Sequence, residues 1–146
     1  MPLQLKSPEV RVIPLVKCDP TGETTVTIRQ ATMHENTQRA DLWATASRIM
    51  RDTLGEELEL KQRISIPEVM RTEVWLTLVG CNLQDAEGKD LFQFRRTADG
   101  RDFMTMTRPN FDSAWGTLPQ AIALEIHEAV IAVNADWGTA AKVLTS

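Results

Sequence analysis

The amino-acid sequence predicts an α+β fold in which an N-terminal antiparallel hairpin packs on a bundle of three to four helices. A third strand can extend this hairpin into a three-stranded sheet. Two observations predict this fold. A β-branched run follows a strong turn signal near the N-terminus. Several later segments repeat apolar residues at intervals of three and four after a helix-capping sequence. The 146 residues fit a single globular domain, residues 1–146, and we expect 1–8 and 138–146 to be loosely ordered.

The predicted hairpin joins two short strands. Val10–Val12 alternates apolar and charged residues, and Pro14 confines this strand to the edge of a sheet because proline has no amide to donate. Asp19–Gly22 is a turn sequence, with proline and glycine at favoured positions. The β-branched run Thr24–Gln30 then supplies the second strand. A lone hairpin is barely stable in water, so it must pack on other elements or pair with more strands.

The middle of the chain predicts a helix, a strand and a second helix. Thr32 and Glu35 form a capping box for a helix that ends at Gly55. Residues 57–66 alternate apolar and polar side chains, which predicts a third strand. A second capping box, Ser65–Glu68, begins the next helix.

That second helix, Val69–Cys81, is apolar over much of its circumference and must be nearly enclosed. We expect it to pack against Ile122, Ile126 and Trp43. Further along, residues 91–95 and 103–106 flank a turn-prone triplet, which predicts a second hairpin or an ordered loop.

The rest of the chain is expected to pack around the segment Asn110–Asn134. Asn110 is a favourable N-cap for a short helix, and Thr117 with Gln120 resembles a capping box for a longer one. The longer helix carries one apolar stripe at intervals of three and four residues: Leu118, Ile122, Ile126, Val130 and Val133.

Leu124 and Ile131 fall outside this stripe, because successive residues are rotated by about 100° around a helix. Two interpretations stay open. Another element of the same domain covers them, as is common for helices buried on two sides, or they belong to a ridge that binds a partner protein. Leu124, Ile131 and Trp137, which follows the helix, are the candidate partner-binding residues.

Composition excludes several classes of protein. A net charge of −4 argues against sequence-independent nucleic-acid binding, which needs clustered lysine and arginine. No apolar run is long enough to span a bilayer, and the first residues lack the hydrophobic segment of a signal peptide. We therefore expect a cytosolic chain without a membrane partner, with Cys18 and Cys81 as reduced thiols.

The sequence contains no motif of a known reaction, so we expect no catalytic residue, no metal and no cofactor. His34 and His127 are each followed by glutamate, but neither has the His-Glu-x-x-His spacing of a zinc site. We interpret both as surface or helix-capping residues. A cluster of basic and aromatic residues can bind single-stranded nucleic acid. In an acidic chain, a loop with solvated arginines is the better interpretation. That cluster comprises Arg95, Arg96, Arg101, Phe92, Phe94 and Phe103.

Four stretches resemble small proteins that tailed bacteriophages and prophages encode beside the tape-measure gene, commonly called tail assembly chaperones. They are Thr27–Thr32, Glu73–Asn82, Leu91–Phe94, and Phe111–Trp137 with its Ala114–Pro119 core. The similarity extends over most of residues 10–137 and consists of the order of predicted elements and of short matching sequence segments. It contains no diagnostic motif and no catalytic residue that could be carried over.

The resemblance implies a non-enzymatic role in the cytoplasm of a bacterial host. Proteins of this group are thought to coat the long, helical, apolar tape-measure protein until tail-tube subunits replace them, and they often self-associate. The expected partners are therefore the tape-measure protein or other tail proteins, and further copies of the chain. A structural virion subunit, such as a tail or connector component, is the alternative, and an enzyme or nucleic-acid-binding regulator is a third.

Overall fold

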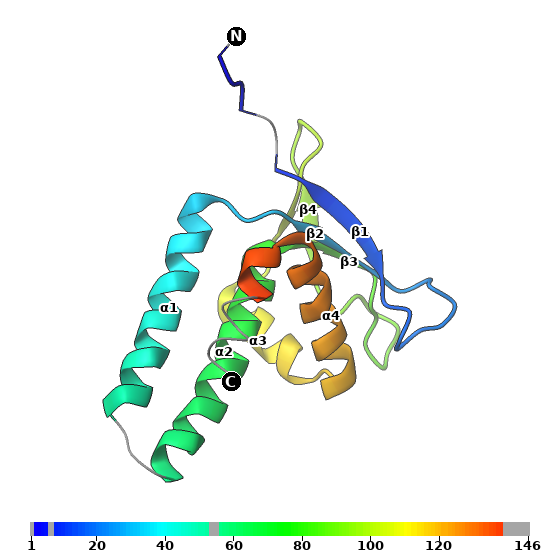
Figure 1. Cartoon of the computed structure of the whole chain (residues 1–146). Coiled ribbons are helices and arrows are strands. Elements are labelled where there is room, and N and C mark those ends of the chain that lie inside the picture. The colour runs from blue at the N-terminus through cyan, green and yellow to red at the C-terminus, as the bar shows by residue number, and fades with distance from the viewer. Residues whose placement is uncertain (1, 6–7, 53–55, 139–146) are drawn as a thin grey trace.

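The structure, a computed structural model, describes the backbone of residues 2–5, 8–52 and 56–138, and the side chains in these ranges except residues 43 and 45–66. The expected α+β class is confirmed (Figure 1). Loose order was predicted for 1–8 and 138–146, and residues 1, 6, 7 and 139–146 lie outside the described part. The elements in chain order are β1 Val10–Pro14, β2 Thr25–Arg29, α1 Met33–Asp52, α2 Glu56–Thr77, β3 Leu78–Cys81, β4 Phe94–Arg96, β5 Asp102–Met104, α3 Arg108–Gly116 and α4 Gln120–Val133.

The predicted N-terminal hairpin forms β1 and β2, which pair antiparallel with Val12 opposite Thr27. β3 adds to the other side of β2, so the strand order is β1-β2-β3 and β1 lies at an edge. A bulge interrupts the β2–β3 register after Thr27. Opposite Thr27 the chain has Gly80, where a Cβ atom would lie 2.9 Å from the threonine Oγ1, so this close approach requires glycine.

The third strand exists, but not where the sequence predicted it. Residues 57–66 belong to the single helix α2, which runs from Glu56 to Thr77 with Pro67 inside it, so the strand and the capping box Ser65–Glu68 are both wrong. The segment is rich in leucine, glutamate, lysine, glutamine and arginine, all strong helix formers, and this preference outweighs a short alternation. The predicted helix Val69–Cys81 ends at Thr77, and its last residues form β3 instead.

The C-terminal helices begin at other residues than predicted. Thr107 caps α3, with its hydroxyl accepting from the Asn110 amide at 3.3 Å, so Asn110 is inside the helix. The Thr117–Gln120 capping box is also wrong. The hydroxyl of Thr117 donates to the Ala114 carbonyl at 2.7 Å and closes α3, while α4 begins after Pro119 without a side-chain cap.

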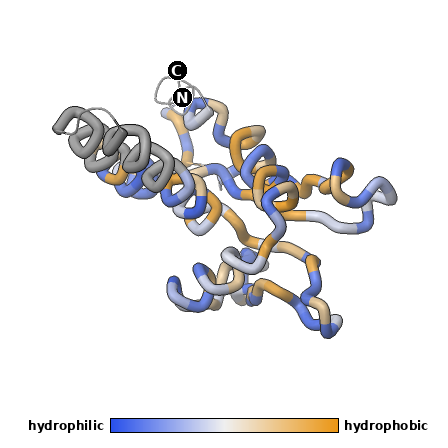
Figure 2. Tube along the Cα trace, turned by 90° about the horizontal axis from the view of Figure 1, so that it is seen from below, coloured by the Kyte–Doolittle hydropathy of each residue, from blue (hydrophilic) through white to orange (hydrophobic). Residues whose placement is uncertain are grey.

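The core lies between the sheet and α4, with hydrophobic residues towards the centre of the chain trace (Figures 1 and 2). Val26 and Ile28 of β2 and Ile126 and Val130 of α4 are all completely buried. Ile122 packs against the same cluster as residues of α2, as expected, whereas the side chain of Trp43 lies outside the described residues. The predicted stripe on α4 is therefore its core face.

Phe111 attaches α3 to the rest of the molecule. Its buried ring lies 5.2 Å from Trp75 of α2, 5.5 Å from Phe92 and 6.1 Å from Trp115, measured between centroids. Aromatic rings at such distances bury a large apolar area and favour a defined geometry. The predicted second hairpin is also confirmed: β4 and β5 pair antiparallel, with Arg95 opposite Phe103.

Candidate functional site

A groove on the outer side of the sheet is the candidate site. It runs between Pro8, the first turns of α1 and the β4–β5 hairpin, and it consists of two adjoining cavities of about 620 and 220 Å³. Its apolar residues come from four places in the chain: Pro8, Val10 of β1, Val79 of β3 and Phe103 of β5. We call it the outer groove.

The apolar residues of the outer groove are unequally exposed. Val79 is almost buried, whereas Val10 is 53% and Phe103 is 43% exposed. This arrangement follows from strand alternation: Ile13 packs against the core, so Val10 and Val12 point to the opposite face of β1. The groove therefore offers apolar side chains to whatever lies in it.

The rim of the outer groove is polar and its charges are paired. Arg101 lies 2.7 Å from Asp99, and Arg96 lies 2.9 Å from Asp102. The hydrogen bond from the Thr97 hydroxyl, followed by that from Arg101, lowers the pKa of Asp99 to about 2. Two arginines of the predicted cluster, Arg96 and Arg101, are thus balanced by carboxylates, which leaves a polar rim instead of a basic face.

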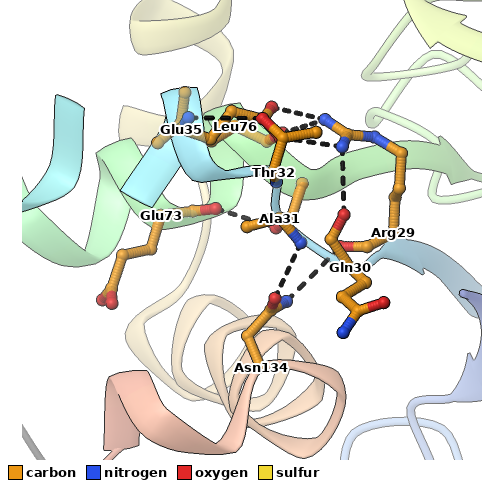
Figure 3. Close-up of polar contacts among 9 residues, drawn as sticks. Arg29, Gln30, Ala31, Thr32, Glu35, Glu73, Leu76 and Asn134 are labelled. Atoms are coloured by element: carbon orange, nitrogen blue, oxygen red, sulfur yellow. Dashed lines mark hydrogen bonds and ion pairs between the residues drawn. The ribbon is translucent and has the colours of Figure 1, made fainter. Parts of the chain in front are cut away.

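A polar junction holds the start of α1 beside the end of β2, as Figure 3 shows. Arg29, at the end of β2, donates to the Glu35 carboxylate at 2.8 Å and to the carbonyl of Leu76 at 2.8 Å. The predicted Thr32–Glu35 capping box is present, because Glu35 accepts from the Thr32 amide at 2.8 Å. Burial alone would raise the pKa of Glu35, but the hydrogen bonds from Arg29 and Thr32 lower it.

Asn134, which follows α4, completes this junction from the other side (Figure 3). Its side-chain oxygen accepts from the Ala31 amide at 2.9 Å, and its nitrogen donates to the Val130 carbonyl at 3.3 Å and the Arg29 carbonyl at 3.4 Å. The link between β2 and α1 is therefore held by α4 through side chain to main chain bonds.

A buried ion network joins the three longest helices. Glu73 of α2 accepts from Nε of Arg39, on α1, at 2.6 Å through one oxygen. Its other oxygen hydrogen-bonds Nε2 of His127, on α4, at 2.8 Å. Both carboxylate oxygens are therefore engaged. Arg39 also donates to the Trp137 carbonyl at 3.0 Å and lies over the indole ring, 5.1 Å from its centroid.

The two histidines differ in their surroundings. His34 is exposed at the first turn of α1, as expected. The interpretation of His127 as a surface residue is wrong, because its side chain is only 12% exposed and faces Glu73 across the helix interface. Sequence spacing contains no signal for this contact, since Glu73 and His127 are 54 residues apart.

The three predicted partner-binding residues do not form one surface. Leu124 is 42% exposed on α4, whereas Ile131 is half-buried against Gly138, where a Cβ atom would lie 2.7 Å from it. Trp137 is only 3% exposed, and its indole nitrogen donates to the Asn36 side chain at 2.6 Å. Its place in an exposed ridge is therefore wrong, because the turn after α4 folds it against α1. Partner binding by Leu124 and Ile131 stays a prediction.

Among the described residues, no group of three or more histidine, cysteine, aspartate or glutamate side chains is arranged to hold a metal ion. None of the helices in this part of the chain has the length and apolar character needed to cross a membrane. No protein-family model, curated protein or solved structure matches the chain.

Proposed function

We propose that this chain is a non-enzymatic assembly factor that holds a protein segment in the outer groove, and that it acts as a bacteriophage tail assembly chaperone. The observation that carries the proposal is the groove itself, with exposed apolar residues inside a polar, charge-balanced rim. Protein-binding surfaces combine these features, because apolar area supplies binding free energy and the rim fixes orientation. Catalysis plays no part in this role.

The chemistry of the groove favours an amphipathic partner. Phe103 and Val10 offer apolar contact, while Gln38, Thr32 and His34 line the α1 side with polar groups. A helix from the partner would place its apolar residues on Phe103 and its polar residues along α1. The tape-measure protein, which is long, helical and apolar, is the partner that the sequence resemblance implies. The site of action is then the cytoplasm of the infected bacterium.

Co-expression with the tape-measure protein encoded in the same genome tests the proposal. A tagged chain is expected to co-purify with the tape-measure protein and to keep it in solution. The proposal is wrong if the tape-measure protein is equally soluble, and is not captured, whether or not the chain is present. Mass spectrometry of finished particles then separates two roles: a chaperone is absent from them, whereas a structural tail or connector subunit is retained.

The same experiment can test the alternative binding surface, the predicted ridge with Leu124 and Ile131. Leu124→Asp alters an exposed side chain on α4 that does not line the outer groove. If Leu124→Asp combined with Ile131→Asp leaves capture and self-association intact in a folded protein, α4 is not the binding surface. Because Ile131 is half-buried, the melting temperature of the double variant must be measured beside its binding.

A further inference from the structure

The free edge of β1 is the second surface of interest. The Gln30 amide donates to the Glu9 carbonyl at 2.7 Å, and the Leu15 amide donates to the Thr24 carbonyl at 2.9 Å. Because main-chain groups alternate sides along a strand, the odd-numbered residues of β1 face β2. The amide and carbonyl groups of Val10 and Val12 therefore point away from the sheet, and no strand of the described chain pairs with this edge.

This edge is protected only in part, by the charge of Arg11 and by Pro14. Val10 and Val12 are β-branched, 53% and 64% exposed, and next to main-chain groups with which no strand of the described residues pairs. An exposed apolar edge is a template for pairing with another strand. Pro14 blocks only the far end, because it has no amide to donate.

We propose that β1 pairs antiparallel with β1 of a second copy of the chain, in the register that places Val10 opposite Val10. The charges on and beside β1 favour a second copy of the chain as the partner and favour this register. This register places Glu9 opposite Arg11 of the other copy on both sides of the two-fold axis, and oppositely charged pairs across strands are stabilising. Both residues are exposed on the face that carries Arg11, whose guanidinium donates to the Ala132 carbonyl at 3.2 Å.

The neighbouring registers lack this complementarity. Pairing Val10 with Val12 would place Arg11 opposite Arg11, which is repulsive, and pairing Val12 with Val12 would place Arg11 opposite Ile13. All three registers allow the same number of main-chain hydrogen bonds, because each pairs the same outward amides with available carbonyls. Charge therefore decides among them.

The pairing has a geometric consequence for the outer surface. An antiparallel pair of identical strands is related by a two-fold axis perpendicular to the sheet. The two sheets would continue into one, with the outer faces of both copies on the same side. The two Val10 side chains would then lie side by side, each Val12 would lie opposite Pro8 of the other copy, and together they would form one apolar surface between the two outer grooves.

Sedimentation equilibrium of the full-length chain over a wide concentration range tests the inference. We expect a dimer that dissociates on dilution. Arg11→Glu and Glu9→Arg should each raise the dimer dissociation constant about tenfold or more, because each places like charges opposite one another twice. The double variant restores opposite charges and should return the constant to within about threefold of the original. Arg95→Glu, an exposed change of equal charge on β4, is the control and should have no effect.

Val12→Pro tests the main-chain contribution, because it removes an outward amide that β2 does not use. It should abolish the dimer while the circular dichroism spectrum stays unchanged. A chain that is monomeric at every concentration would overturn the inference. So would a dimer that both single charge variants and the double variant weaken equally, since charge would then not set the register. None of these results depends on whether the outer groove binds the tape-measure protein.

Discussion

Glu73 and His127 meet in the interior, where Oε1 of the carboxylate lies 2.8 Å from Nε2 of the imidazole. The other oxygen of Glu73 accepts from Arg39, and the Glu73 side chain is only 1% exposed. A buried carboxylate is costly unless both of its oxygens are engaged, and here two helices supply the partners. This carboxylate is therefore a structural joint between α1, α2 and α4.

The first prediction concerns that joint. Glu73→Gln keeps the shape of the side chain but removes the counter-charge of Arg39, so the free energy of unfolding should fall by about 3 kcal/mol. Glu128→Gln is the matched control, because Glu128 pairs with Lys17 on the surface. It should cost much less, because a solvent-exposed ion pair contributes little to stability. Urea denaturation measures both, and equal losses would show that the buried network is not a stabilising joint.

The second prediction concerns Asn134. Asn134→Ala leaves the partly buried main-chain amide of Ala31 without its acceptor. The free energy of unfolding should therefore fall by about 1–3 kcal/mol. Amide hydrogen exchange of Ala31 should accelerate in the variant. Asn110→Ala, at an exposed position inside α3, is the control and should leave both quantities unchanged. Unaltered exchange at Ala31 in Asn134→Ala would contradict the role given to this side chain.

The third prediction concerns acid stability. Hydrogen bonds from Thr21 and Thr24 lower the pKa of Asp19 to about 2, from 3.8 in an unstructured chain. Since the folded pKa is the lower one, the ionised carboxylate contributes stability above the unfolded value and loses it as pH falls through the folded value. Asp19→Asn should therefore flatten the pH dependence of unfolding between about pH 4 and pH 2.

An NMR titration of the Asp19 carboxyl carbon checks the cause directly. Thr24→Val removes the hydroxyl that donates to Asp19 at 2.8 Å, so the pKa of Asp19 should rise. The account of this turn fails if the pKa of Asp19 is the same in the variant and the parent chain.

The fourth prediction concerns the thiols. Burial raises the pKa of Cys81 to about 11, and this thiol is half-buried at the end of β3. Cys18 is exposed in the loop after β1. A hydrogen bond with Glu125 also raises the pKa of Cys18, so exposure decides the difference: a maleimide should label Cys18 in the folded chain and Cys81 only after unfolding. Mass spectrometry of peptides measures both, and equal labelling in the folded state would contradict the packing of β3.

Local sequence signals were sufficient where neighbours in the chain make the contacts. The turn Asp19–Gly22 and the β-branched run after it predicted β1 and β2, and Thr32 with Glu35 predicted the start of α1. The stripe on α4 predicted its core face. Each depends on interactions within a few residues, which sequence periodicity and capping patterns describe directly.

Local sequence signals gave wrong or missing predictions where two local preferences competed or where distant segments of the chain meet. Residues 57–66 carry both a strand-like alternation and strong helix formers, and the helix prevailed. β3 could not be placed because its pairing with β2, including the close contact between Gly80 and Thr27, joins segments about fifty residues apart.

The outer groove was missed for the same reason. Val10 and Phe103 belong to predicted strands, but only the tertiary arrangement shows that they share one face. Trp137 was named as a candidate partner-binding residue, and its burial was missed because its contacts, Asn36 and Arg39, lie on a helix about a hundred residues earlier. Burial of a residue outside a periodic stripe depends on such distant neighbours.

Isothermal titration of the chain with a purified tape-measure segment tests the central claim most directly. Phe103→Asp introduces a charge into the outer groove and should weaken binding at least about tenfold, because desolvating an unpaired carboxylate is costly. Lys89→Asp, an exposed change in a turn that does not line the outer groove, should bind as the parent chain does. If Phe103→Asp binds the segment as tightly as the parent while Leu124→Asp does not, the outer groove is not the binding site and α4 is.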